Sequence, residues 1–226
     1  MAGAVRSGLL AIAFLVAVLG AAFAITPSKI WNAGVDGRGR TGLQAFASWL
    51  DKSRVQKRRF AEFEDFLDSE GVANIVPAWQ LTRADTFQGS KCVSEPFLIP
   101  PRESWKKIVP ALRLVETEVK PRLGEVEVVS TFRSPDVNRC AGGAGRSRHL
   151  RFEALDLRIE ADLPRQDIFA ELCDMWRIAG PRSGMGLGAY YDPEDPEYNR
   201  KGRFHIDAGG YRTWGRTYSR DSSPCV

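Results

Sequence analysis

The chain holds only two histidines among 226 residues, and each lies in a short segment beside acidic residues. The first, His149, precedes Asp156 by seven residues, and the second, His205, precedes Asp207 by two. Zinc binds imidazole nitrogen and carboxylate oxygen, and a catalytic zinc site uses three protein ligands with one position left for water. Two histidines and one aspartate therefore make His149, Asp156 and His205 a candidate metal site.

Two strand-like segments would position these side chains. Residues Glu153 to Ile159 and Arg203 to Ala208 have the composition of strands, and the second is the last strand that the sequence predicts. Side chains two residues apart share one face of a strand, so His205 and Asp207 would point the same way. If the two strands pair, His205 could meet Asp156, and the other histidine would arrive from the preceding loop. On spacing alone, a buried structural histidine is the better interpretation of either residue.

Other segments predict the surrounding elements. Apolar residues recur at helical spacing over residues 43–50, 60–67, 105–119 and 164–179. Thr41 with Gln44 matches a capping box, and Ser134-Pro135 is typical of a helix start. Residues 125–132 form a β-branched strand candidate. We expect most of the aromatic residues in the first two helices to pack into a core.

The first 24 residues are typical of a secretory signal peptide. Arg6 is their only charge, Leu9 to Leu19 form an apolar run, and Ala22-Phe23-Ala24 has the form of a cleavage site. The apolar run is short for a membrane span, which needs about 20 residues. An uncleaved membrane anchor is the alternative. Either way we expect an exported protein, periplasmic or extracellular, with an N-terminal extension containing a helix at 25–74 and a main domain at 75–226.

Composition indicates a globular protein with disulfides. Hydrophobic residues make up 43% of the chain, charged residues 27%, and the net charge is +4, which identifies no partner. The four cysteines are Cys92, Cys140, Cys173 and Cys225. In an oxidising compartment an even number of cysteines predicts two disulfides, and three connectivities remain open.

The motifs carry more than their spacing. The chain resembles the zinc D-alanyl-D-alanine peptidase family, which shares its fold with the Hedgehog signalling domain, in three motifs: Ser147-x-His149, Ala154-x-Asp156 and His205-x-Asp207. Further segments match a peptidoglycan-directed branch with a His-x-Asp motif, namely Ser130 to Pro135, Gly142-Gly143-Ala144, and Phe204 to Asp207 ahead of Tyr211 to Trp214. The resemblance implies an α+β fold with a small antiparallel sheet and flanking helices.

The resemblance also implies roles for individual residues. His149, Asp156 and His205 would bind Zn²⁺, which lowers the pKa of its water and polarises the scissile carbonyl. Arg133 would contact the substrate and stabilise the oxyanion of the tetrahedral intermediate. Ser147 would bind substrate, or its hydroxyl would shape the loop.

Two positions depart from the family pattern. The family glycine between the first histidine and the aspartate is Phe152 here, which predicts a bulky side chain near the site. Many members place an acid three residues before the last histidine, where this chain has Gly202. Asp207 is the best substitute as general base, although it could equally hold the tautomer of the last histidine. Acidic residues of the loop before this strand are further candidates for the base, namely Glu194, Asp195 and Glu197.

These features predict a secreted zinc metallopeptidase that cleaves a peptide bond next to a D-amino acid in peptidoglycan, as a carboxypeptidase or a cross-link endopeptidase. The alternative is a catalytically inactive module of the same fold that binds cell wall or a protein; a metal-free structural domain is a third possibility. We expect peptidoglycan peptide stems as the partner, no nucleic acid, and membrane contact only if the N-terminal segment stays uncleaved. The oligomeric state is left open.

Overall fold

The computed structural model describes residues 39–84, 92, 95–159, 163–192, 194 and 202–226. All of them belong to one compact unit, Asp36–Val226. The expected signal peptide at residues 1–24 lies outside the described residues, as does most of the loop that holds Asp195 and Glu197. In the part of the chain that is described, no helix is long and apolar enough to cross a membrane.

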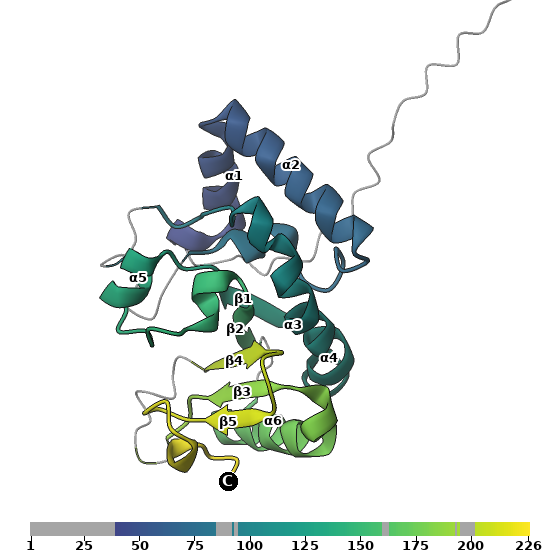
Figure 1. Ribbon diagram of the computed structural model, residues 1–226, viewed down its shortest axis with the longest axis vertical. Coiled ribbons are helices and arrows are strands. Elements are labelled where there is room, and N and C mark those ends of the chain that lie inside the picture. Colours follow the sequence, from purple (N-terminus) through teal and green to yellow (C-terminus); the bar gives the residue numbers. More distant parts are fainter. Residues whose placement is uncertain (1–38, 85–91, 93–94, 160–162, 193, 195–201) are drawn as a thin grey trace, which may run out of the picture. The chain divides into compact units, whose positions relative to one another are not determined.

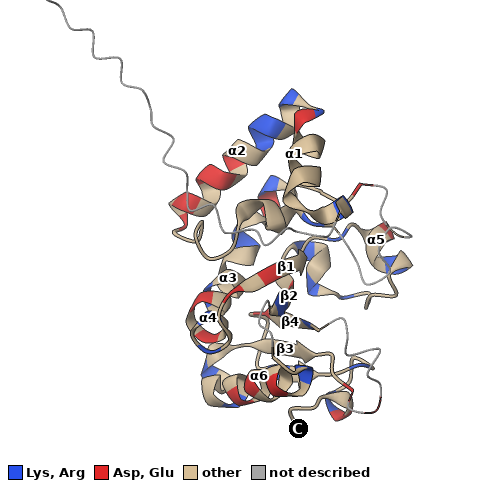
Figure 2. Cartoon of the chain, turned by 180° about the vertical axis from the view of Figure 1, so that it is seen from behind, with Lys and Arg blue, Asp and Glu red and all other residues tan. Residues whose placement is uncertain are grey.

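Two helices open the described chain, α1 (Leu43–Asp51) and α2 (Arg54–Ser69). The side chain of Ser53 accepts a backbone N–H of α2 and caps that helix. Basic residues gather at the start of α2 and acidic residues at its end (Figure 2), which is the unfavourable order for the helix dipole. Tertiary packing must therefore hold α2, and its buried residues Phe60, Phe63 and Leu67 supply that packing.

The two expected helix starts had different outcomes. The capping box at Thr41 was wrong, because Gly42 is the N-cap of α1 and no side chain caps that end. Thr41 instead lies in the preceding 3-10 turn. The start at Ser134 was confirmed, since its hydroxyl accepts the N–H of Val137 at 3.3 Å and caps α5 (Pro135–Cys140).

A continuous helical stretch precedes the sheet. It runs through a 3-10 segment η4 (Arg102–Ile108), α3 (Val109–Leu114), a π-helical segment η5 (Val115–Val119) and α4 (Lys120–Leu123). Pro110 lies in the first turn of α3, where its missing N–H costs no hydrogen bond. Gly124 ends the stretch with φ at 74°, a conformation that glycine adopts without a Cβ clash.

Five strands form one sheet in the order β1-β2-β4-β3-β5 (Figure 1). The strands are β1 (Val126–Ser130), β2 (Ala154–Ile159), β3 (Gly186–Ala189), β4 (Arg203–Asp207) and β5 (Arg212–Trp214). Three neighbouring pairs are antiparallel, and β3 with β5 is parallel. The α+β fold with flanking helices was confirmed. The sheet is mixed and not antiparallel as expected. The reason is β5, a strand that the sequence did not predict, which pairs parallel to β3.

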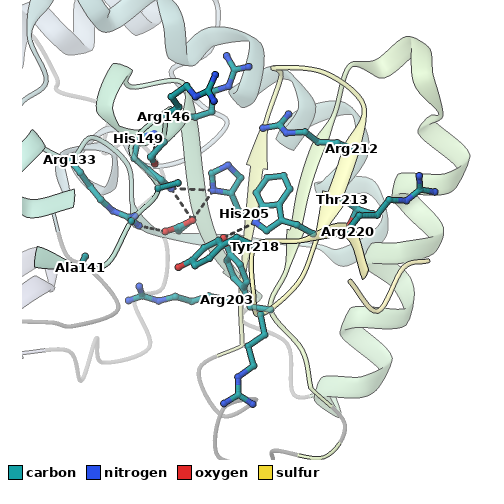
Figure 3. A pocket seen from close by; sticks show the side chains of 18 residues that line it. Arg133, Ala141, Arg146, His149, Arg203, His205, Arg212, Thr213, Tyr218 and Arg220 are labelled. Carbon is teal, nitrogen blue, oxygen red and sulfur yellow. Dashed lines mark hydrogen bonds and ion pairs between the residues drawn. The ribbon is translucent and has the colours of Figure 1, made fainter. Parts of the chain in front are cut away.

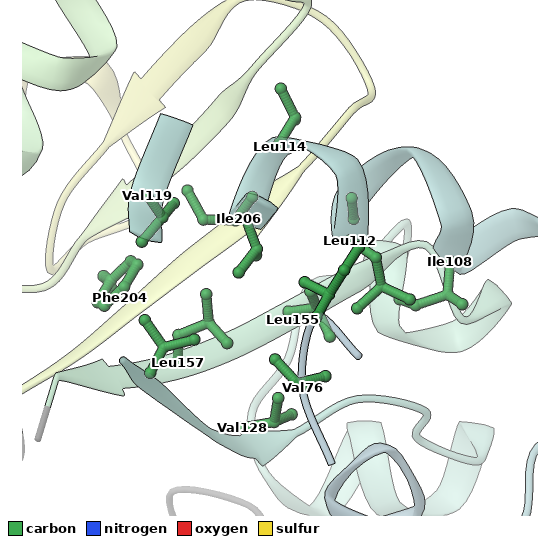
Figure 4. Close-up of a cluster of buried hydrophobic side chains, with 14 of the residues drawn as sticks. Val76, Ile108, Leu112, Leu114, Val119, Val128, Leu155, Leu157, Phe204 and Ile206 are labelled. Atoms are coloured by element: carbon green, nitrogen blue, oxygen red, sulfur yellow. The ribbon is translucent and has the colours of Figure 1, made fainter. Parts of the chain in front are cut away.

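One face of the sheet forms the core. Leu155, Leu157, Phe204 and Ile206 alternate along β2 and β4 and are fully buried (Figure 4). Helix α3 contacts β4, and α6 (Arg165–Ala179) contacts β3. Because neighbouring side chains on a strand point to opposite faces, Asp156 and His205 face away from these helices. The helices therefore cover the apolar face and leave the other face for polar side chains.

The N-terminal helices pack onto the same core. The ring of Phe63 in α2 lies 5.2 Å, between centroids, from Trp105 and 6.1 Å from Phe152. Phe46 and Trp49 of α1 both contact Phe97. The division into an extension and a main domain at residue 75 stays a prediction, although the described part of the extension shares its core with the sheet.

Both expected disulfides are present, and the structure settles their pairing. Cys92 pairs with Cys140 at the end of α5, and Cys173 of α6 pairs with Cys225. The second bond fixes the C-terminal segment to α6, and Arg177 adds a hydrogen bond to the carbonyl of Cys225 at 3.1 Å. Two disulfides are typical of a protein that folds in an oxidising compartment.

Candidate functional site

Strand pairing brings the candidate ligands together. Asp156 of β2 lies directly opposite His205 of β4, as the sequence predicted. His149 arrives from a short 3-10 turn, η6 (Arg148–Arg151), that precedes β2. Three of their atoms form a triangle, because His149 Nε2, His205 Nδ1 and Asp156 Oδ1 lie 3.1 Å from one another (Figure 3). We call these three buried residues the ligand cluster.

Partners on the far side of each ring determine which nitrogen faces the triangle. His149 Nδ1 contacts the carbonyl oxygen of Thr131, which accepts hydrogen bonds only, so Nδ1 carries the proton. His205 Nε2 lies 3.0 Å from Asp207 Oδ2, so it also carries its proton outward. A neutral imidazole has one N–H. Both inward nitrogens of the neutral rings therefore present lone pairs.

This arrangement fits a metal ion. When both rings are neutral, two imidazole lone pairs and a carboxylate oxygen face one another at 3.1 Å with no proton between them. These electron-rich atoms repel one another, and a cation at their centre would remove the repulsion. Zinc bonds of about 2.0–2.1 Å in a tetrahedral site imply ligand–ligand distances of about 3.3 Å, close to those of the triangle. The outward hydrogen bonds are those that orient histidine ligands in metal sites.

The two rings differ in their affinity for a proton. Burial lowers the pKa of His149 to about 4, and the neighbouring charge of Arg133 adds to the effect. Burial acts in the same direction on His205, but hydrogen bonds to Asp156 and Asp207 outweigh it and raise its pKa. A proton on His205 would occupy the lone pair that a metal needs. Protons and metal ions therefore compete mainly at this ring.

Arg133 holds the outer oxygen of the aspartate ligand. Its Nη2 contacts Asp156 Oδ2, and its Nε donates to Ser130 Oγ at 3.3 Å. A bulge between Val128 and Ser130 places Ser130 opposite Asp156, on the polar face of the sheet. Burial would raise the pKa of Asp156, but the neighbouring charge of Arg133 helps to hold it well below its usual range. Asp156 is thus kept ionised as a ligand must be.

Asp207 lies behind the ligand cluster and is fully buried. Besides His205, it accepts two hydrogen bonds from Arg212, at 3.0 and 2.6 Å, and one from the N–H of Gly209 at 2.7 Å. Burial would raise its pKa, but His205 and Arg212 hold the pKa below its usual range. All its lone pairs point toward fixed donors, and it does not line the cleft. Its position matches the tautomer-holding role that the sequence left as the alternative.

Two glycines of β3 create the space for these contacts. A Cβ at Gly186 would lie 2.5 Å from Arg212 Nη1 and 2.8 Å from Asp207 Oδ2. A Cβ at Gly188 would lie 2.8 Å from the indole of Trp214 and 2.9 Å from the Cβ of His205. Because these glycines leave the polar face of β3 bare, side chains of β5 reach across it to those of β4. This alternation of glycines was the signal that the sequence reasoning missed.

Trp214 and Tyr190 complete the wall beside His205. The rings of Trp214 and His205 meet edge to face with centroids 5.0 Å apart. Trp214 Nε1 donates to the hydroxyl oxygen of Tyr190 at 3.2 Å. Burial and the nearby charge of Asp156 raise the pKa of Tyr190, so its phenol keeps its proton and acts as a donor. Both side chains line the cleft, and neither was singled out from the sequence as a site residue.

Ser147 and Arg133, the two residues expected to bind substrate, both line the cleft. The Ser147 hydroxyl accepts the backbone N–H of His149 at 3.3 Å and caps the turn that carries this ligand. The loop-shaping role is therefore present. Contact of either residue with substrate stays a prediction.

The two departures from the family pattern have structural reasons. Phe152 has φ 57° and ψ 44°, the left-handed conformation that favours glycine. Its side chain points into the core beside Phe63. The prediction of a bulky side chain near the site was therefore wrong. Gly202 also has a positive φ, 53°, and a Cβ there would lie 2.6 Å from the guanidinium of Arg165. Any side chain at this position would be strained by the backbone, and the guanidinium of Arg165 would have to shift to make room for it.

A cleft of about 680 Å³ opens over the ligand cluster. Among its described lining residues, seven are arginines and only Asp156 is acidic; the arginines are Arg133, Arg146, Arg148, Arg203, Arg212, Arg216 and Arg220. Glu194, the one described residue among the loop candidates for the base, is exposed and is not part of this lining. The other loop candidates for a base, Asp195 and Glu197, lie outside the described residues.

A family model described as Peptidase M15, a family of zinc D-alanyl-D-alanine peptidases, matches residues 80–191. Over this segment, just under half of the chain, the protein is similar to that family. The matched segment contains two of the three ligand-cluster residues, His149 and Asp156, and ends before the strand that carries His205. The third candidate ligand, His205, therefore lies outside the family match, and strand pairing places it beside the other two. No significant match was found among curated proteins or among solved structures.

Proposed function

We propose that the protein is an exported zinc peptidase that hydrolyses a peptide bond next to a D-amino acid in peptidoglycan, with His149, Asp156 and His205 as the zinc ligands. The observation that carries the proposal is the triangle of ligand atoms at 3.1 Å, whose outward hydrogen bonds leave the lone pairs of the neutral rings facing inward. Similarity to the M15 family over residues 80–191 supports a metallopeptidase. The two disulfides support a location outside the cytoplasm.

Bound zinc would polarise the scissile carbonyl and activate water for attack. The chain's own contribution is to hold its ligands still and to stabilise charge. Arg133 is suited to the developing oxyanion, because it lines the cleft and its Nη1 has no hydrogen-bond partner among the described residues. The protonated Tyr190 hydroxyl, held by Trp214, would donate a second hydrogen bond to the substrate.

We assign Asp207 a positioning role and not that of general base. A base must reach the proton that it removes, within hydrogen-bond distance or through one water. Asp207 is fully buried, bonded to His205 and Arg212, and absent from the cleft lining. We therefore expect the base in the acidic loop, at Asp195 or Glu197.

The second candidate function is a cell-wall or protein-binding module that keeps the zinc site without turnover. One observation favours it: the described lining of the cleft contains no carboxylate other than Asp156, which already faces both imidazoles and Arg133. In that case zinc would bind and no peptide bond would be cleaved, whatever the substrate.

Digestion of purified peptidoglycan tests the proposal. The chain lacking residues 1–24 is incubated with peptidoglycan in the presence of zinc or of a chelator, and the products are identified by mass spectrometry. We expect zinc-dependent products, with loss of one terminal residue indicating a carboxypeptidase and separated cross-linked stems indicating an endopeptidase. A His205→Ala variant, confirmed as folded by circular dichroism, is the control. Tight binding of one zinc per chain without any products would overturn the peptidase and support the binding module.

A further inference from the structure

Positive charge is concentrated in the cleft. The seven arginines and one aspartate of its described lining give a formal charge of +6, whereas the whole chain carries +4. The remainder of the molecule is therefore slightly acidic. A bound divalent metal would make the cleft still more positive. Acidic residues behind the lining balance part of this charge, and an anionic ligand can balance more of it.

Four of the arginines already have acidic partners. The pairs are Arg133 with Asp156, Arg148 with Glu153, Arg212 with Asp207, and Arg216 with Asp192. Arg146 and Arg220 have no ion-pair partner among the described residues, and both are exposed. We call these two residues the arginine rim. Their guanidinium groups are available for a ligand in a way that those of the paired arginines are not.

The two rim arginines come from opposite sides of the ligand cluster. Arg146 lies in the loop that precedes η6, next to β2. Arg220 begins the short 3-10 turn η8 (Arg220–Ser222), which packs on the edge strand β5. His205 lies on β4, between β2 and β5 in the sheet order. Figure 3 shows the labelled arginines arranged around His149 and His205.

We propose that the cleft selects peptides that carry at least two free carboxylates, one on each side of the scissile bond, and that Arg146 and Arg220 bind them. An extended peptide over the ligand cluster would run from one rim arginine toward the other. Guanidinium groups pair with carboxylates through two parallel hydrogen bonds, which gives geometric selection as well as charge. The inference rests on the proposed peptidase function and specifies its substrate: stem peptides with free side carboxylates over stems whose carboxylates are amidated.

Steady-state kinetics on a matched pair of synthetic stem peptides test this inference. One peptide has its carboxylates free, and the other has the side carboxylates amidated. Exposed ion pairs are individually weak, so we expect each of Arg146→Gln and Arg220→Gln to raise KM about threefold and the double variant about tenfold, with kcat nearly unchanged. The effect should be confined to the free-carboxylate peptide and should shrink at high salt.

Arg122→Gln is the matched control, because Arg122 is an exposed arginine of α4 outside the cleft lining. It should leave both peptides unaffected. Equal kcat/KM of the unaltered protein for the two peptides, or an unchanged KM in the double variant, would overturn the inference.

A binding measurement separates this inference from the proposed function. If the protein cleaves neither peptide, isothermal titration of the zinc-loaded chain and of His205→Ala with both peptides still reports the selection. Tighter binding of the free-carboxylate peptide that is lost in the rim double variant supports the arginine rim even without hydrolysis. Binding that ignores the carboxylates overturns it.

Discussion

The ligand cluster and the arginine rim border the same cleft but are built differently. Each cluster residue is buried and contacts one further residue behind it. The partners of His149, Asp156 and His205 are Thr131, Arg133 and Asp207, in that order. The rim residues Arg146 and Arg220 are exposed and have no ion-pair partner among the described residues. Two paired strands and one capped turn thus hold the ligand cluster, whereas a loop and an exposed turn carry the groups that would select the substrate. Substitutions in the two regions should therefore fail in different ways.

Removal of a ligand should have the largest effect. In His205→Ala the triangle loses one of its three ligand atoms, so we expect loss of tight zinc binding and a fall in hydrolysis of at least about a thousandfold. Zinc content by mass spectrometry and product release are measured on the same sample. The rim variant Arg146→Gln should keep a full complement of zinc. Equal zinc loss in both variants would remove the distinction between cluster and rim.

A substitution beneath the cluster should affect stability first. Phe152→Gly removes a fully buried ring but relieves its left-handed backbone, so we expect a net loss of about 3 kcal/mol in the free energy of unfolding. Chemical denaturation measures this change. Zinc affinity of the folded variant should stay close to that of the unaltered chain, because the ring points away from the ligand atoms. A large loss of affinity without loss of stability would mean that Phe152 shapes the site directly.

The support behind His205 should have an intermediate effect. Arg212→Gln leaves Asp207 with a weaker partner, and loss of such an outer contact lowers metal affinity by about 10- to 100-fold. We expect a higher Kd for zinc than in the unaltered protein, and hydrolysis that recovers at saturating zinc.

The same assay separates the two roles of Asp207. If it only positions His205, Asp207→Asn activity should largely recover when excess zinc fills the site. Activity that stays low at full zinc occupancy would identify Asp207 as the base.

Zinc affinity should also depend on pH. The pKa of His205 is raised in the metal-free chain, so below that pKa a proton must leave before zinc binds. We expect affinity to fall about tenfold for each pH unit below the pKa of this single group. His149, with a pKa of about 4, should not contribute near neutral pH. Competition titrations at several pH values measure the slope, and an affinity that does not change between pH 7 and pH 5 would contradict this assignment.

The sequence predicted the parts of the site that depend on strand periodicity. Asp156 and His205 could be placed on one face because alternation along a strand follows directly from the order of residues. Helix ends at Ser134 and Gly124 were predictable because local hydrogen bonds and backbone conformation determine them.

The features that were missed depend on contacts distant in sequence. Strand β5 has three residues, and its parallel pairing with β3 carries no local signal. Arg212 can reach Asp207 because Gly186 has no Cβ, which would occupy the space between them. The direction of the Phe152 side chain follows from a left-handed backbone, which a phenylalanine in the sequence does not indicate.

Zinc reconstitution tests the central claim most directly. The chelated chain is titrated with zinc, and both bound metal and release of peptidoglycan products are followed in the same samples. The account predicts one zinc per chain, product release that rises in proportion to occupancy, and neither signal in His149→Ala or His205→Ala. Product release that is complete without zinc, or zinc binding that survives both substitutions, would contradict it.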